Sequence, residues 1–237
     1  VAAVDFDRAV TEFAAKLRPL SGATQELSVC RGFCMLIRRD VIDKVGLLDE
    51  KFDIGFFEET DYCKRAGVAG FKMARAKAAY VYHRESASFS MRPDTDMIFR
   101  RNELRYFAKW GRPVQAAYFA TDRAAASDID DIASGIARAG HKMIVFLKKG
   151  VSWPVKTDHI DIARFDLDSL FFVPISVYKI LKRKKKKKLD VLITDSAVMG
   201  SILKGFAFLH GSSVLVSPTK EAVLSELSKI SVKSKGS

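Results

Sequence analysis

The chain has 237 residues, 48% of them hydrophobic, and carries a net charge of +12 at neutral pH. Such a chain is long and apolar enough to bury one large core or two modest ones. No apolar run reaches the roughly 18 residues of a membrane span, and no signal peptide is visible. These features speak against an integral membrane protein and predict a cytoplasmic one.

The first predicted element is an amphipathic helix in residues 8–17. Its apolar residues recur at helical spacing and would share one face: Val10, Phe13, Ala14 and Leu17. The preceding Asp5-Phe6-Asp7 has the letters of a D-x-D metal motif. Because the helical pattern follows directly, we interpret these residues as the start of the helix and not as a metal site.

A short apolar run, residues 33–37, predicts a buried strand. Asp40 then predicts an N-cap for a helical turn in residues 41–45, which Gly46 would end. Cys30, Cys34 and Cys63 are odd in number and form no C-x-x-C pair. We therefore predict buried, reduced thiols and neither a zinc site nor a disulfide.

A cluster of acids, Glu58, Glu59 and Asp61, lies where an extended stretch gives way to a helix-compatible segment. The positive end of a helix dipole favours ionised carboxylates, so these residues are candidate bases. Gly55 permits a left-handed backbone just before them. Gly70 would end the helix ahead of a strand-like segment, residues 71–83, which closes on His83 and could bring it to the same rim.

This part of the chain resembles the acceptor-side half of family-2-type glycosyltransferases of the GT-A fold. The match covers residues 26–112 and rests on six segments: 32–39 (GFCMLIRR), 45–53 (VGLLDEKFD), 55–65 (GFFEETDYCKR), 69–72 (AGFK), 80–89 (YVYHRESASF) and, more weakly, 100–111 (RRNELRYFAKWG). In such enzymes a carboxylate removes a proton from an acceptor hydroxyl while that oxygen attacks the anomeric carbon of a nucleotide sugar.

The resemblance assigns roles to the acids. Glu59 stands where the family usually has the basic Asp, Asp61 matches the second acid, and Glu58 lies beside them. His83 stands where some relatives place a ligand of the divalent metal, Mn²⁺ or Mg²⁺, that neutralises the leaving diphosphate. The alternatives stay open: the acids could serve only to stabilise a helix start, and His83 could be a hydrogen-bonded wall residue.

Relatives bind the nucleotide through an N-terminal half that ends in a D-x-D motif, on the order of a hundred residues before the acids. Only 57 residues precede Glu58, and the sequence begins with Val. We therefore expect a piece of a longer protein, which by itself would be inactive.

Strands and helices alternate beyond Gly111. The pattern predicts strands in 114–122, 142–148, 189–196 and 213–218, with helices in 128–140 and 198–211. Such alternation indicates a parallel, Rossmann-like sheet. It also resembles the N-terminal domain of GT-B glycosyltransferases, although the loop after the first strand has no glycine, which argues against a phosphate cradle there. His141 is interpreted as a polar residue entering a strand, and His159 and His210 have no informative neighbours.

The run Lys182–Lys188 supplies seven of the positive charges, which leaves +5 for the rest of the chain. A solvated loop is the simplest interpretation. The alternative is attraction to anionic lipid headgroups, which would suit work on lipid-linked glycans at the inner face of a membrane. Specific nucleic-acid binding is not expected, because no aromatic residues interleave with the lysines.

The sequence thus predicts an α/β chain in two parts. Residues 1–112 would be the C-terminal half of a GT-A domain, and residues 113–237 a truncated Rossmann-like domain of the GT-B type. The expected function is sugar transfer, with inversion, from a nucleotide sugar to a glycan or lipid-linked acceptor. The alternative is a non-catalytic basic α/β module that binds a partner or a membrane surface.

Overall fold

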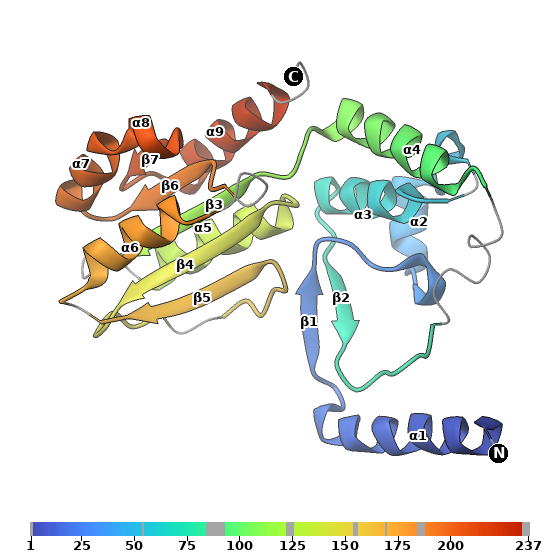
Figure 1. The fold of residues 1–237 in the computed structure, drawn as a ribbon. Coiled ribbons are helices and arrows are strands. Elements are labelled where there is room, and N and C mark those ends of the chain that lie inside the picture. The colour runs from blue at the N-terminus through green and yellow to red at the C-terminus, as the bar shows by residue number, and fades with distance from the viewer. Residues whose placement is uncertain are drawn as a thin grey trace. The chain divides into compact units, whose positions relative to one another are not determined.

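The computed structural model describes residues 2–53, 55–83, 93–121, 126–153, 156–168, 170–183 and 188–233. The chain divides into two compact units, Val1–Lys109 and Trp110–Ser237, and each is described by itself. Figure 1 shows the first unit in blue to green and the second in green to red.

The first unit contains four helices and two strands among its described residues. The helices are α1 (Ala2–Leu17), α2 (Arg39–Val45), α3 (Glu58–Val68) and α4 (Thr95–Trp110), and the strands are β1 (Thr24–Leu27) and β2 (Met73–Ala76). The strands pair antiparallel, with Thr24 opposite Ala76. A small core forms where Val41 of α2 packs with Tyr62 and Ala66 of α3. A two-stranded sheet does not identify a GT-A half, so that part of the expected fold remains a prediction.

The predicted strand in residues 33–37 is wrong. Gly32–Cys34 forms a 3-10 turn, closed by a hydrogen bond from the Cys34 N–H to the Arg31 carbonyl. The side chain of Leu36 is 99% exposed, and Cys34 is exposed as well, against the expectation of buried thiols. A short apolar run forms a buried strand only where a neighbouring strand pairs with it, and β1 and β2 pair with each other instead. Of this run, Ile37 packs against the small core around Val41.

Other expectations in this unit are partly confirmed. Helix α2 ends at Gly46, whose φ is +84°. Its N-cap is Arg38, however, and Asp40 lies inside the first turn, where its carboxylate pairs with the Arg38 guanidinium at 2.6 Å. Helix α1 begins before Asp5, so the D-x-D letters lie within the helix. Of the strand-like residues 71–83, only Met73–Ala76 forms a strand.

The second unit is a five-stranded parallel sheet with helices on both faces. Its strands are β3 (Gln115–Ala120), β4 (Lys142–Lys148), β5 (Ile162–Leu167), β6 (Val191–Thr194) and β7 (Ser213–Val216). They lie side by side in the order β5-β4-β3-β6-β7, and every neighbouring pair is parallel (Figure 1). The chain therefore starts at the centre, runs outward to β5, and returns to run outward on the other side. This topology confirms the Rossmann-like sheet.

Two buried clusters fill the faces of this sheet. On one face lie α5 (Ala126–Arg138) and α9 (Lys220–Lys233), which contribute Ile129, Ile136, Val223 and Leu227. The other cluster includes α6 (Phe172–Leu181) and α7 (Ala197–Gly205), the latter followed by the short α8 (Ala207–His210). In Figure 1, α6 lies in front of the sheet and α5 behind it.

The Lys- and Ser-rich segment after β7 forms a helix that packs on the sheet. Residues 220–233 form α9, whose Val223 and Leu227 are fully buried. The Ser231 hydroxyl donates a 2.8 Å hydrogen bond to the Arg112 carbonyl, which ties this helix to the segment that enters β3. Gly111, with φ +80°, permits the contact: a Cβ there would lie 2.2 Å from the Ser231 Oγ.

Candidate functional site

The acid cluster of the first unit forms the first turn of α3. The side chains of Glu58 and Glu59 are half-buried, and the Oε2 atom of each is buried without a hydrogen-bond partner within the part of the chain that the structure describes. Burial raises the pKa of Glu58, and the neighbouring Glu59 carboxylate raises it further. Two adjacent carboxylates with open acceptor positions can receive hydrogen bonds from a hydroxyl-bearing ligand.

The backbone that leads into this turn is strained. Gly55 has φ +138°, and Phe56 and Phe57 follow with φ +66° and +75°. Positive φ is uncommon outside glycine, and two consecutive aromatic residues in this conformation cost of order 1–3 kcal/mol each. Such strain persists where contacts with the surrounding structure hold the backbone in place. It is found most often at functional sites.

The side chain of Asn102, in α4, holds the strained turn in place. Asn102 is fully buried, and its amide Nδ2 donates to the carbonyls of Phe52, Gly55 (2.8 Å) and Phe56 (3.2 Å). The ring of Phe57 also packs against Phe99 of the same helix, with centroids 5.4 Å apart. Helix α4 therefore holds in place the backbone that leads into Glu58 and Glu59.

Asp61 differs from the two glutamates because both of its oxygens are occupied. It is fully buried, with Oδ2 2.8 Å from the Arg65 Nε and Oδ1 2.7 Å from the Lys109 Nζ. Arg65 in turn donates to the carbonyls of Val45 and Leu47. Asp61 thus ties α3 to α4 and, through Arg65, to the end of α2. A carboxylate held this way by two cations is arranged for structure more than for proton transfer.

His83 lies on an exposed stretch, and its ring stacks on that of Phe33 at a centroid distance of 4.2 Å. The adjacent Gly32 borders Glu59: a Cβ on Gly32 would lie 3.8 Å from the Glu59 Cβ. His83 therefore contacts the segment that lies beside Glu59, and no direct contact of His83 with the acids is observed among the described residues. Among the described residues, however, no group of three or more His, Cys, Asp or Glu side chains is arranged to hold a metal ion.

The remaining histidines accept hydrogen bonds from backbone N–H groups of the second unit. The Nδ1 of His141 accepts from the Val114 N–H, that of His159 from the Asp161 N–H, and that of His210 from the Ser212 N–H. His141 thus bridges the starts of β3 and β4 and has the polar role expected of it.

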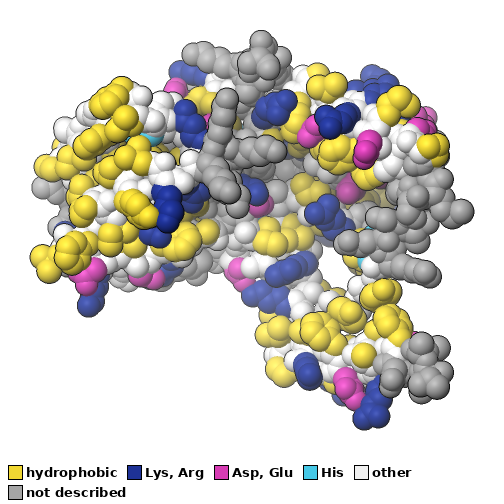
Figure 2. All heavy atoms as spheres, viewed as in Figure 1, with side chains coloured by type: hydrophobic (Ala, Val, Ile, Leu, Met, Phe, Trp, Pro, Cys, Tyr) yellow, Lys and Arg dark blue, Asp and Glu magenta, His cyan; other side chains and the backbone are white. Residues whose placement is uncertain are grey.

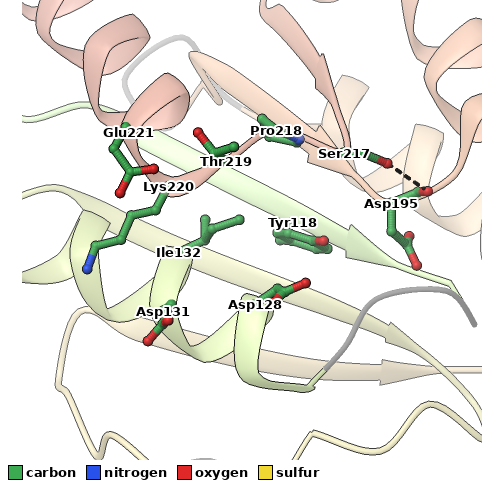
Figure 3. A pocket seen from close by; sticks show the side chains of 10 residues that line it. All are labelled: Tyr118, Asp128, Asp131, Ile132, Asp195, Ser217, Pro218, Thr219, Lys220 and Glu221. Carbon is green, nitrogen blue, oxygen red and sulfur yellow. Dashed lines mark hydrogen bonds between the residues drawn. The ribbon is translucent and has the colours of Figure 1, made fainter.

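A second candidate site lies in the second unit, at the carboxyl ends of its strands. There a cavity of about 790 Å³ is lined by residues of β3, α5, the end of β6 and the loop from β7 into α9 (Figure 3): Tyr118, Asp128, Asp131, Ile132, Asp195, Ser217, Pro218, Thr219, Lys220 and Glu221. The strand order reverses between β3 and β6, and open α/β sheets bind ligands at such switch points.

The lining of this cavity is acidic. It has four carboxylates and one ammonium, and two of the carboxylates, Asp128 and Glu221, belong to the first turns of α5 and α9. A helix N-terminus attracts anions, but here the chain places its own carboxylates at both. The Asp195 carboxylate already accepts hydrogen bonds from the N–H and the hydroxyl of Thr121. The cavity is therefore poorly suited to a diphosphate.

Sequence reasoning identified the acids but missed the residue that positions their turn. Asn102 lies 46 to 50 residues beyond the carbonyls that it binds, in a helix whose pattern gives no sign of a buried amide. The left-handed Phe56 and Phe57 were missed as well, because only Gly55 carries a local signal. Comparison of the chain with family models, with curated proteins and with solved structures finds no match in any of the three.

Proposed function

We propose that the acid turn of the first unit is the acceptor-side catalytic element of an inverting glycosyltransferase, with Glu59 as the general base. The proposal places a hydroxyl of a glycan or lipid-linked acceptor against the open oxygens of Glu58 and Glu59. A nucleotide sugar is the proposed donor. The second unit, with its Rossmann-like sheet, would be the GT-B-like part of the same enzyme.

The observation that carries the proposal is the pair of half-buried glutamates, each with one oxygen that no described residue satisfies. A buried acceptor without a partner costs of order 1–3 kcal/mol, so a fold retains it where a ligand supplies the partner. The strained, clamped backbone just before the pair adds support, because strain of this kind is typical of functional sites.

The proposed reaction balances with Glu59 as the proton acceptor. The carboxylate takes the proton of the acceptor hydroxyl as the oxygen forms a bond to the anomeric carbon of the donor. The bond from that carbon to the diphosphate breaks on the opposite side, and the nucleoside diphosphate leaves with the bonding electrons. Attack from the opposite side inverts the configuration.

The other expected site residues take more limited roles. Asp61 is proposed to position α3, because both of its oxygens already bind cations. The resemblance implies Mn²⁺ or Mg²⁺ with His83 as a ligand. Since the described residues supply no ligand set around His83, the proposal assigns no step to a metal.

The acidic lining of the cavity in the second unit argues against binding of the nucleotide-sugar donor there. A nucleotide sugar carries a negatively charged diphosphate, and four carboxylates around one ammonium would repel it. The proposal therefore leaves donor recognition outside this cavity. A second candidate function, a non-catalytic module that binds a membrane surface, is favoured by the exposed apolar side chains and the lysines of α6 and α7 in this unit.

The test is a sugar-transfer assay on the full-length natural protein with Glu59→Gln. This variant keeps the size of the side chain and removes the proton acceptor, so turnover should fall by roughly 10²-fold or more while donor affinity stays unchanged. Glu50→Gln, an exposed glutamate in the same unit, is the matched control for the lost charge and should retain activity.

Near-normal turnover of Glu59→Gln would remove Glu59 from the role of base. If Asp61→Asn abolished turnover with no change in melting temperature, the role would move to Asp61. We expect instead that Asp61→Asn lowers the melting temperature, because it leaves Lys109 and Arg65 without their shared carboxylate.

A further inference from the structure

Helices α6, α7 and α8 of the second unit are apolar on the side that faces away from the sheet. Their inward side chains include Phe172, Ile180, Met199 and Leu203, which belong to the buried core. Their outward side chains are large and apolar too: Tyr178, Leu181, Val198, Phe206, Phe208 and Leu209 are all exposed, Phe208 at 81%. A helix that is apolar all round is normally covered on all sides.

These outward residues form one surface, here called the α6–α8 face. Helix α8 contacts both α6 and α7, so the three helices are neighbours. Figure 2 shows hydrophobic side chains gathered over this part of the second unit, with Lys and Arg side chains among them. Large contiguous apolar patches on a protein surface mark sites of interaction with another molecule.

The described charges of the segments that hold these helices are all positive. Residues 170–183, 188–189 and 196–219 contain five Lys or Arg residues and no Asp or Glu. The described basic side chains lie next to the apolar ones. The Lys182 ammonium is over the Tyr178 ring at 5.2 Å, and the Lys188 ammonium lies 3.0 Å from where a Cβ on Gly211, just after α8, would be.

Of the run Lys182–Lys188, the structure describes Lys182, Arg183 and Lys188, whereas residues 184–187 lie outside the described residues. The other described cations of these helices are Lys179 in α6 and Lys204 in α7. In contrast, the helices α5 and α9 of the opposite face carry both acidic and basic residues. Only the α6–α8 side of the unit thus combines exposed apolar side chains with charges of one sign.

We propose that the α6–α8 face binds the surface of a membrane that contains anionic lipids. Lysine and arginine at the rim would meet phosphate headgroups, while Phe206, Phe208 and Leu209 enter the boundary between headgroups and acyl chains. The acid-free composition favours this occupant over an ordinary protein partner, whose interfaces mix both signs of charge. Lysine, which dominates here, attracts headgroups as a mobile point charge.

Among the described residues no helix is long and apolar enough to span a bilayer, so the contact described is peripheral. It has two components that respond differently to salt. Attraction by the cations is screened as ionic strength rises, whereas burial of Phe208 is not. The inference does not depend on the proposed transferase activity, because it needs no catalysis.

The first experiment is vesicle flotation with the full chain. Vesicles of phosphatidylcholine with phosphatidylglycerol should bind it, those of phosphatidylcholine alone should bind it far less, and binding should weaken as salt rises. Phe208→Ser should lower the partition coefficient about tenfold at every salt concentration and leave the salt dependence unchanged. Replacing Lys182–Lys188 with Ser and Gly should flatten the salt dependence.

Leu36→Ser is the matched control, because Leu36 is 99% exposed on the first unit. It should bind vesicles like the unaltered chain, and unchanged melting temperatures should show that all variants fold. Equal losses for Phe208→Ser and Leu36→Ser would overturn the proposal, as would equal binding to neutral and anionic vesicles.

A second measurement reports insertion directly. Tryptophan fluorescence of Phe208→Trp should shift to shorter wavelength on anionic vesicles and be quenched by lipids with brominated acyl chains, whereas Leu36→Trp should show no change beyond that of the unaltered chain. Absence of quenching for Phe208→Trp while the protein floats with the vesicles would overturn the insertion.

Other occupants give different results. If the face joined two copies of the chain, light scattering would show a dimer that Phe208→Ser dissociates, and vesicles would not bind. If it bound nucleic acid, single-stranded RNA would compete with vesicles and Phe208→Ser would weaken both. Either result would overturn the membrane proposal.

Discussion

The glutamates of the acid turn differ from Asp61, three residues away at most, in what surrounds each carboxylate. Asp61 binds two cations, whereas Glu58 and Glu59 each keep an oxygen that no described residue satisfies. The same short sequence thus yields one structural carboxylate and two available ones. Residue type and spacing alone cannot separate these roles, because the separation depends on Arg65 and on Lys109 from another helix.

Glu58 gives a prediction for pH dependence. Burial raises its pKa above the ordinary value of about 4.3. The folded state therefore holds this proton to higher pH than the unfolded state does, and stability falls as pH rises from the ordinary to the raised value. Above that pH range Glu58 is ionised in the folded state as well, and its buried charge lowers the free energy of unfolding by the full amount. Glu58→Gln should accordingly raise the melting temperature at pH 7 and have little effect below pH ~4.

Thermal melts of Glu58→Gln and the unaltered chain across this pH range would check the effect. Glu50→Gln, which also removes one charge but at an exposed position, should give a pH-independent difference. A Glu58→Gln variant less stable than the unaltered chain at pH 7 would show that ionised Glu58 has a favourable partner, and the open-oxygen interpretation would be wrong.

At the scale of elements, the strained turn before α3 depends on α4. The Asn102 side chain donates to the carbonyls of Phe52, Gly55 and Phe56. Asn102→Leu would fill a similar volume but leave these carbonyls without the amide. We expect a loss of about 2–4 kcal/mol in the free energy of unfolding of the first unit.

Urea denaturation followed by circular dichroism would measure the loss for Asn102→Leu. Leu104→Ala, in the same helix but 64% exposed, should change stability by no more than about 0.5 kcal/mol. If Asn102→Leu were as mild as Leu104→Ala, the turn would be held by its own backbone and the aromatic contacts, and the clamp would be unnecessary.

Helix α7 offers a matched pair of glycines. A Cβ at Gly200 would lie 2.3 Å from the Val216 Cγ2 in β7, whereas one at Gly205 would meet nothing within 4 Å. Valine is stiff at χ1 and cannot move aside easily. Gly200→Ala should therefore destabilise the second unit by about 1–3 kcal/mol, and Gly205→Ala should be neutral or stabilise it by about 0.5 kcal/mol.

The same denaturation assay compares these two variants. Because both changes add one methyl group to one helix, helix propensity predicts stabilisation in both. Only the contact with Val216 separates them. A stabilising Gly200→Ala would mean that α7 can shift away from β7.

The elements that the sequence predicted well are those with a strong period of their own. The apolar patterns of their sequences predict the buried strands β3, β4 and β6 and the helix α5. Strand β5 did not, because it lies at the sheet edge and carries the exposed pair Arg164 and Asp166. Helix α9 was hidden as well, since Lys and Ser on its outer face obscure its buried residues, Val223 and Leu227.

The candidate site was predictable only in its local part. Glu58, Glu59 and Asp61 at a helix start follow from sequence, and α3 confirms that placement. The support from Asn102 and Lys109 depends on α4 docking against the turn, which no local pattern reports. The apolar α6–α8 face was equally invisible, because a helical period does not tell which side of an apolar helix a core will cover.

At the scale of the whole molecule, the two units differ in the size of their cores. The small cluster of Val41, Tyr62 and Ala66 contrasts with the two clusters that cover both faces of the five-stranded sheet. All twelve of the largest fully buried side chains belong to the second unit. Because apolar burial dominates stability, the first unit should be the less stable one.

This difference predicts unfolding in two steps, with the first unit unfolding at lower urea concentration. The buried Trp153 lies in the second unit, whereas Trp110 is the last residue of α4, at the boundary with the first unit. Tryptophan fluorescence of a Trp110→Phe variant should therefore follow the later step, whereas far-ultraviolet circular dichroism should report both. Asn102→Leu should move only the earlier step, and Gly200→Ala only the later one, because each change lies in a different unit. A single transition that coincides for both probes, and that either substitution shifts as a whole, would show instead that the two units fold as one cooperative body.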